Sequence, residues 1–147
     1  MKKAVFLIFL TIAVSSQAQN WKRGLAVVVY HTATIALGAV ADGLYDDGYK
    51  EWGHALHAVE LGAVLAGPFI HKPRGAAEIV SYLISYGFLR FSFFDAFYNW
   101  TRGLPMNYIG STSHYDQFFA QMPPDGRAWW KSCSLVVGIA IPIKSFR

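Results

Sequence analysis

The chain of 147 residues is long enough for one domain, and 15% of its residues are charged against 54% hydrophobic and 16% aromatic. Soluble domains average about 25% charged residues, so this composition argues against an ordinary water-covered surface. The formal charge is +4, but the Lys and Arg residues are scattered, and nucleic-acid binders gather such residues into a patch or stripe. Nucleic acid is therefore not expected as a partner. Cys133 is the sole cysteine, which excludes an internal disulfide.

Residues 1–18 have the three parts of a secretory signal peptide. A pair of lysines precedes the apolar run 4–14, and Ser16-Gln17-Ala18 supplies small residues at the two positions that signal peptidase recognises. We predict cleavage after Ala18, which leaves residues 19–147 as a single helical membrane domain. The alternative is an uncleaved first membrane helix, although the apolar run is shorter than the roughly 20 residues that a span requires.

Four further apolar stretches predict membrane helices, and a hydrophilic stretch separates the last two. The helices are expected near residues 25–41, 54–70, 76–100 and 127–143, with a polar loop at 101–126. In that loop, Ser113 and Asp116 match a capping box, which predicts a short surface helix through Phe118, Phe119 and Met122. The fold class is thus all-α: a small helical transmembrane bundle of about four membrane helices after an N-terminal signal peptide. We expect a multi-pass protein in the inner membrane of a bacterium, in contact with the lipid bilayer.

Polar side chains follow one side of the first and third predicted helices. A polar and small stripe on an apolar helix faces other helices, because small residues allow close backbone approach and polar groups find partners there. Arg90 falls off this line and is expected to extend its stem to the membrane interface. The residues expected in the polar core are His31, Asp42, Glu78, Asp95 and Asn99.

The second predicted helix has two distinct faces. Ala58, Gly62 and Ala66 recur every four residues, which predicts the face that packs against other helices. His57 and Glu60 lie on the opposite face. An ionisable group at a membrane helix centre costs about 2.5–3.5 kcal/mol on insertion scales, so such groups usually have partners or a functional role.

The spacing of acids and histidines around this helix suggests a metal site. Glu51-x-x-His54 and His57-x-x-Glu60 each place a carboxylate and an imidazole one helical turn apart. Di-iron carboxylate bundles use two Glu-x-x-His motifs on separate helices together with two further glutamates; this chain has one motif in that order. The hypothesis is a divalent transition metal bound by Glu51, His54, His57 and Glu60, with His31 or Asp42 and Glu78 or Asp95 completing the shell.

Two other interpretations of the same residues stay open. The polar groups can satisfy one another and fix helix register, or they can form a proton or ion path. No nucleophile elbow, P-loop or H-E-x-x-H motif occurs in the sequence. The leading functional hypothesis is a non-enzymatic membrane subunit or scaffold that binds another membrane protein or a second copy of itself. The alternative is a membrane-embedded, metal-dependent enzyme that acts on a lipid or another apolar substrate.

Overall fold

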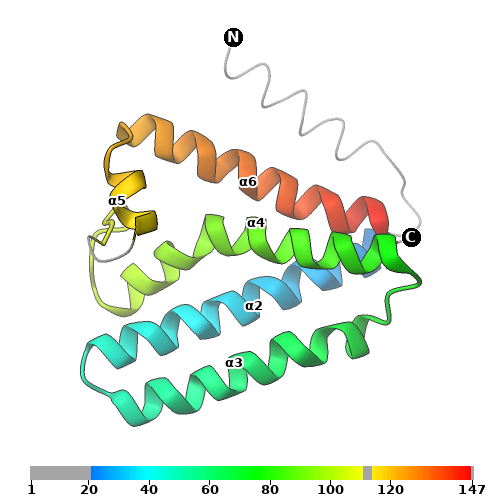
Figure 1. The fold of residues 1–147 in the computed structure, drawn as a ribbon, viewed down its shortest axis with the longest axis horizontal. Coiled ribbons are helices and arrows are strands. Elements are labelled where there is room, and N and C mark those ends of the chain that lie inside the picture. Colours follow the sequence, from blue (N-terminus) through cyan, green and yellow to red (C-terminus); the bar gives the residue numbers. More distant parts are fainter. Residues whose placement is uncertain (1–20, 111–113, 147) are drawn as a thin grey trace.

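A computed structural model describes residues 21–110 and 114–146, so the predicted signal peptide, its cleavage site and Ser113 lie outside the described residues. The described residues form five helices and no strand, which confirms the all-helical prediction (Figure 1). The helices are α2 (Trp21–Asp46), α3 (Lys50–His71), α4 (Ala76–Thr101), α5 (His114–Ala120) and α6 (Pro124–Ser145). The long helices extend past the predicted apolar stretches, because hydropathy marks the apolar part of a helix and not its polar ends.

Short turns join the first three of these helices. After α2, Gly48 adopts a φ of 94° that a side chain would disfavour, and the N–H of Asp47 donates to the carbonyl of Gly43 at 3.0 Å. After α3, Lys72 takes a left-handed conformation with a φ of 47°, and Pro73 follows it. Because both connections are short, α2, α3 and α4 run antiparallel to their neighbours in the chain.

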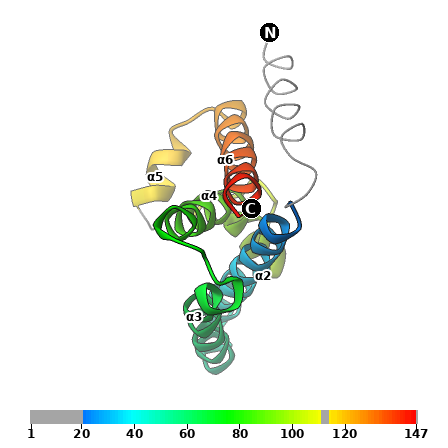
Figure 2. The same cartoon turned by 90° about the vertical axis from the view of Figure 1, so that its right-hand side faces the viewer.

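α2 lies at the centre of the bundle. It packs against α3, α4 and α6, and α4 packs in turn against α6. The end-on view in Figure 2 places α3 apart on one side of α2, with α4 and α6 on the other. The apolar core lies between α2, α4 and α6, and its fully buried members include Val27, Ile35, Leu89 and Phe146.

A row of serines on α4 holds α6 in place. The hydroxyl of Ser81 lies 2.8 Å from that of Ser145, Ser85 donates to the carbonyl of Gly138 at 2.7 Å, and Ser92 donates to the carbonyl of Lys131 at 3.0 Å. Short hydroxyl side chains allow two helices to approach closely while their polar groups remain satisfied. The α4–α6 contact is therefore fixed along most of its length.

The prediction that Ala58, Gly62 and Ala66 form the packing face of α3 is wrong. Ala58 is exposed, and a Cβ added to Gly62 would have no atom within 4 Å. The buried positions are instead Gly53, which meets Tyr45 of α2, and Gly67, which meets the Tyr82 hydroxyl of α4. α3 is turned so that His57 and Glu60 face the bundle, because their polar partners lie on α2 and α4.

Two of the described helices, α2 and α3, have the length and apolar composition needed to cross a membrane. They differ in burial: half of the apolar window of α2 is buried within the protein, but only 11% of that of α3. α2 is a core helix, whereas α3 presents most of its apolar surface outward.

Candidate functional site

A cluster of charged and polar side chains, here termed the polar network, lies between α2, α3 and α4. Its centre is Glu60 of α3, whose side chain is 12% exposed. Arg90 of α4 donates to Glu60 Oε1 at 3.0 Å, and the Tyr86 hydroxyl donates to the same oxygen at 3.4 Å. His57 Nδ1 lies 3.2 Å from Glu60 Oε2, and His57 Nε2 lies 2.8 Å from Oδ1 of Asp42 on α2. Glu60 thus joins α3 to α4, and His57 joins α3 to α2.

The backbone of α2 leaves room for this carboxylate at Gly38. A Cβ added there would collide with the carboxylate oxygens of Glu60. Both ring nitrogens of His57 face carboxylates, which only accept hydrogen bonds, so the geometry suits the doubly protonated ring. Two anions, Asp42 and Glu60, are then balanced by two cations, His57 and Arg90. Such balance offsets the cost of removing charge from water.

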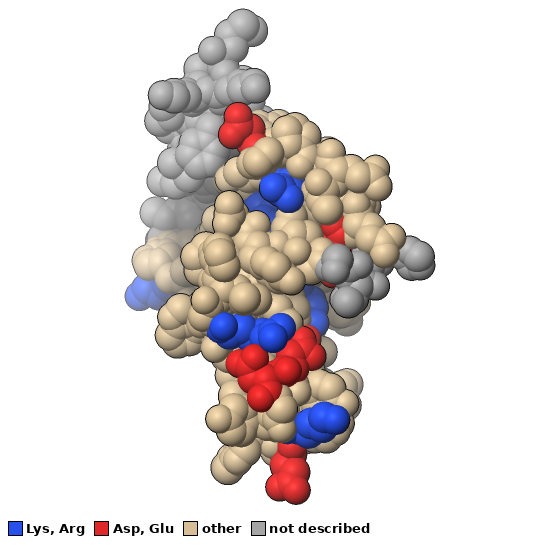
Figure 3. Space-filling model, turned by 90° about the vertical axis from the view of Figure 1, so that its left-hand side faces the viewer, with Lys and Arg blue, Asp and Glu red and all other residues tan. Residues whose placement is uncertain are grey.

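A second charged cluster lies at the end of the bundle where α2 and α4 end. The Tyr98 hydroxyl donates to Asp46 at 2.5 Å, and Arg102 donates to Asp47 at 2.9 Å and to the Tyr98 oxygen at 2.8 Å. The hydrogen bond of Arg102 to Tyr98 and, to a smaller extent, that to Asp47 raise the pKa of the Arg102 guanidinium above its ordinary value. Figure 3 looks at this end, where acidic side chains lie directly against basic ones.

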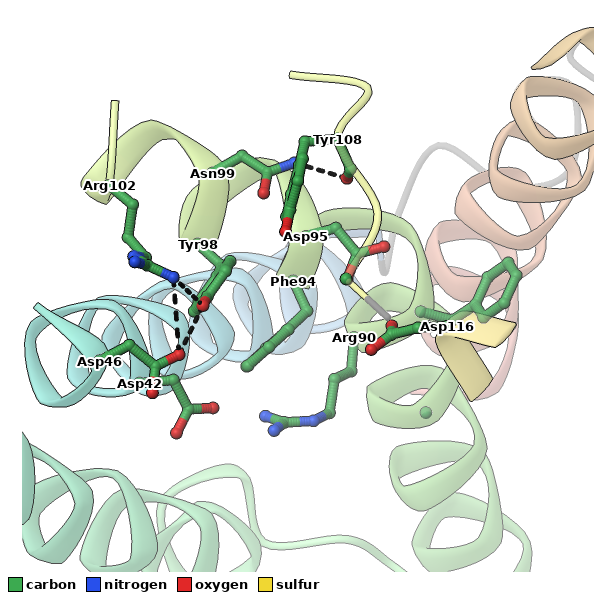
Figure 4. A pocket seen from close by; sticks show the side chains of 13 residues that line it. Asp42, Asp46, Arg90, Phe94, Asp95, Tyr98, Asn99, Arg102, Tyr108 and Asp116 are labelled. Carbon is green, nitrogen blue, oxygen red and sulfur yellow. Dashed lines mark hydrogen bonds and ion pairs between the residues drawn. The ribbon is translucent and has the colours of Figure 1, made fainter. Parts of the chain in front are cut away.

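The two clusters border a cavity of about 630 Å³, here termed the acidic pocket. Figure 4 shows that Asp42 and Arg90 extend into it from α2 and α4, while Asp116 approaches from α5. Phe94 lies between them, and the Arg90 guanidinium stacks 4.2 Å from the centre of its ring. The residues that line the acidic pocket are Asp42, Asp46, Gly87, Arg90, Phe91, Phe94, Asp95, Tyr98, Asn99, Arg102, Tyr108, Gly110 and Asp116.

The residues predicted for the polar core are distributed along the whole bundle. His31 is 1% exposed and donates from Nε2 to the Tyr82 carbonyl at 3.1 Å. Asn99 is equally buried and donates to the Tyr108 carbonyl at 2.9 Å, which anchors the loop after α4. Asp42 and Asp95 are half-buried and border the acidic pocket. These residues contact other parts of the protein, but they do not form one cluster.

Glu78 lies at the opposite end of the bundle. It accepts from the backbone N–H of Arg74 at 2.9 Å and from the Arg23 side chain at 3.5 Å. Arg23 also donates to the carbonyls of His71 and Lys72, at 3.2 and 3.3 Å. Glu78 therefore ties the start of α2 to the α3–α4 turn and has no access to the acidic pocket.

Two of the four proposed metal ligands lie together. His57 and Glu60 are neighbours, whereas the His54 ring packs against Tyr45 at 5.2 Å and Glu51 is exposed to solvent. Within the described ranges, no group of three or more His, Cys, Asp or Glu residues is arranged to hold a metal ion. Asp42 and Glu60 contact opposite nitrogens of His57, which prevents the three from converging on one point. The metal site stays a prediction.

Arg90 is the network member whose role the sequence did not indicate. It was expected to extend to the membrane interface, but it pairs with Glu60 across the α3–α4 gap. Lys131 of α6 is a similar case, because it donates to Asp95 at 2.6 Å. The available signal was charge balance: three acids inside apolar helices, Glu60, Glu78 and Asp95, imply cations nearby.

Comparisons of the chain with known protein families, curated proteins and solved structures find no match. The function is therefore inferred from the geometry of this chain alone.

Proposed function

We propose that this protein is a multi-pass membrane protein of the bacterial inner membrane in which α2, α3, α4 and α6 are the spans. In this role it is a non-enzymatic subunit or scaffold that contacts a partner through α3. The observation that carries the proposal is the exposed apolar surface of α3. At about 1.5 Å per residue, its 22 residues span the hydrocarbon core of a bilayer. Only Gly53 and Gly67 of this helix are buried.

The exposed side chains of α3 are large and apolar. Leu61 and Leu65 are 60% and 63% exposed, and Phe69 is 80% exposed. A continuous apolar surface of this kind is rare on soluble monomers and marks contact with lipid or protein. The polar network supports the same location, because its charges are paired with one another between α2, α3 and α4 and lie away from this surface.

Aromatic side chains support the membrane location independently. Trp52, Trp100, Trp129 and Trp130 are all half-exposed or more, and they lie near the start of α3, the end of α4 and the start of α6. These three helix ends meet at one end of the bundle (Figure 1). Tryptophan concentrates at the headgroup level of membranes, since its ring is both apolar and able to donate a hydrogen bond.

Replacing Leu65 with a photo-crosslinking amino acid tests both parts of the proposal. The membranes are washed with alkaline carbonate, and the crosslinked adducts that remain in them are then detected. We expect the protein to stay in the washed membrane and to form a protein adduct of one fixed mass, because Leu65 lies at the centre of the exposed α3 surface. Val80 of α4 is 52% exposed, does not line the cavity that Leu65 borders, and is the matched position for random collision. We expect no discrete adduct from it.

The two parts can fail separately. Release of the wild-type protein by carbonate would contradict the membrane location. Adducts with lipid alone at Leu65, in protein that stays in the membrane, would contradict the subunit role.

A second candidate is the membrane-embedded metal enzyme, and the position of His57 beside two carboxylates favours it. We nevertheless expect detergent-purified protein to hold no metal that depends on His57, because both ring nitrogens and one oxygen of Glu60 are already hydrogen-bonded. Elemental mass spectrometry of the wild type and of His57→Ala measures this. Near-stoichiometric metal that disappears in His57→Ala would establish the metal site and contradict the non-enzymatic role.

A further inference from the structure

A second cavity, here termed the apolar groove, lies between α4, α5 and α6. It encloses about 610 Å³, within the range of about 300–1,000 Å³ that is typical of ligand pockets. α5 closes one side, where the Phe119 ring packs 5.2 Å from the Phe91 ring of α4. Ser134 supplies the sole polar side chain among its lining residues, which are Ile84, Gly87, Phe88, Phe91, Phe118, Phe119, Met122, Trp130 and Ser134.

The apolar groove continues into the acidic pocket, because Gly87 and Phe91 line both. Residues 84, 87, 88 and 91 of α4 are three and four positions apart and form one face of the helix. The same face continues through Arg90, Phe94, Asp95 and Tyr98 toward the end of α4. One helix face therefore changes from apolar to charged along its length, as an amphiphile does from its chain to its headgroup.

The charges of the acidic pocket select the kind of headgroup. Four carboxylates line it, from Asp42, Asp46, Asp95 and Asp116, against the two guanidiniums of Arg90 and Arg102. Both arginines already pair with carboxylates outside the lining, Glu60 and Asp47, while Asp42 pairs with His57 and Asp95 with Lys131. Carboxylates still outnumber cations by six to four when these partners are counted. This excess of acid favours a cationic group. Each arginine has five N–H donors, however, and can contact a phosphate as well.

Aromatic rings strengthen the preference for an ammonium group. Phe91, Phe94, Tyr98 and Tyr108 line the same pocket, and ring faces attract cations electrostatically. A headgroup that combines a primary ammonium with a phosphate thus finds carboxylates and ring faces for one charge and arginine donors for the other.

We propose that the acidic pocket and the apolar groove form one binding site for a bilayer lipid with an amino headgroup. The headgroup lies in the acidic pocket near the end of α4, and an acyl chain lies in the apolar groove toward the middle of that helix. This orientation matches that of a lipid in the leaflet at the acidic end of the bundle. The inference rests on the proposed membrane location and extends it to a specific ligand.

Gly87 offers a sharp test, because it lies where the two cavities join. A Cβ added there would have no atom within 4 Å, so Gly87→Leu fills the junction without disturbing the packing of the helices. Gly62→Leu is the matched control, since Gly62 is equally unobstructed and lines neither cavity. Native mass spectrometry of detergent-purified protein is then used to titrate phosphatidylethanolamine and phosphatidylglycerol with identical chains.

We expect phosphatidylethanolamine to bind at least about tenfold more tightly than phosphatidylglycerol, a ratio that corresponds to about 1.4 kcal/mol. Gly87→Leu should weaken phosphatidylethanolamine binding by about the same factor, and Gly62→Leu should leave it unchanged. Asp42→Asn removes one carboxylate and keeps an oxygen for His57. It should lower the affinity for phosphatidylethanolamine and not lower that for phosphatidylglycerol, because removing a carboxylate lessens the repulsion of an anionic headgroup.

Equal binding of the two lipids, or an unchanged preference in Asp42→Asn, would overturn the assignment of the acidic pocket to an amino headgroup. Unchanged binding in folded Gly87→Leu would overturn the joined site. Because these measurements are made in detergent, they are independent of the carbonate wash. Protein that stays in the membrane but does not prefer phosphatidylethanolamine would contradict the lipid site alone.

Discussion

Replacing Arg90 with methionine is expected to lower the free energy of unfolding by about 1–3 kcal/mol. This lies between the cost for an exposed ion pair and that for a buried one, because the Arg90 side chain is 38% exposed and that of Glu60 is 12% exposed. Methionine keeps most of the length of the side chain but leaves the Glu60 carboxylate, 12% exposed, without its cation. The hydroxyl of Tyr86 and the ring of His57 remain as partners, but Tyr86 is neutral and His57 is shared with Asp42. Unfolding in mixed micelles of a mild detergent and dodecyl sulfate, followed by tryptophan fluorescence, measures the change.

A double-mutant cycle assigns this cost to the pair. Glu60→Gln combined with Arg90→Met removes both charges, and replacing a whole buried pair with neutral groups is often close to neutral in stability. We therefore expect the double variant to be more stable than Arg90→Met alone. Lys22→Met removes one positive charge from an exposed position and should have little effect. Additive losses in the cycle would show that Arg90 and Glu60 act independently, contrary to the polar network described above.

Replacing Gly24 with alanine is expected to separate the start of α2 from the end of α6. A Cβ at this position would lie 2.6 Å from the carbonyl oxygen of Pro142 and from the amide nitrogen of Ile143. These are backbone atoms of a helix and cannot rotate away as a side chain can. Overpacking of this kind costs about 1–3 kcal/mol, and the rigid neighbour places Gly24→Ala at the upper end of that range.

The position of Phe146 reports the same displacement. This residue is fully buried against Val27 and Tyr82, just beyond the point where Gly24 meets α6. We expect Gly24→Ala to expose position 146. The measurement is the rate at which a maleimide reagent labels Phe146→Cys in protein that lacks Cys133, and this rate should rise when Gly24→Ala is added. Gly62→Ala is the control. It adds the same methyl group where no atom lies within 4 Å, and alanine is favoured over glycine in a helix. Equal stability of the two variants would contradict the close α2–α6 contact.

These two predictions concern different means of holding helices together. Gly24 acts through shape, because the absence of a side chain lets two backbones approach. The polar network acts through charge, and it also sets which face of α3 meets the bundle. If α3 docks a partner, the polar network determines which apolar surface that partner meets. Its loss in Arg90→Met should then reduce the crosslinking at Leu65 as well as the stability.

The helical fold class and the approximate place of each long helix could be predicted from the sequence, because hydropathy and helix-breaking residues are local properties. The sequence also identified the buried faces of α2 and α4, where polar and small residues recur at helical spacing and His31, Ser85 and Asn99 are indeed buried. A stripe of one helix can be recognised without knowledge of its partner. The short helix α5, expected within the 101–126 loop, belongs to the same class of local feature.

Which side chains contact one another became known from the packing of the helices. The face of α3 could not be predicted from its small residues, since Gly62 and Gly67 are chemically identical and differ only in what lies opposite them. The pairing of Glu60 with Arg90 joins residues 30 positions apart on different helices, and no local pattern specifies such a pair. The junction of the acidic pocket with the apolar groove likewise depends on how α4, α5 and α6 are placed. Helix content follows from the chain locally, whereas a site follows from distances between helices.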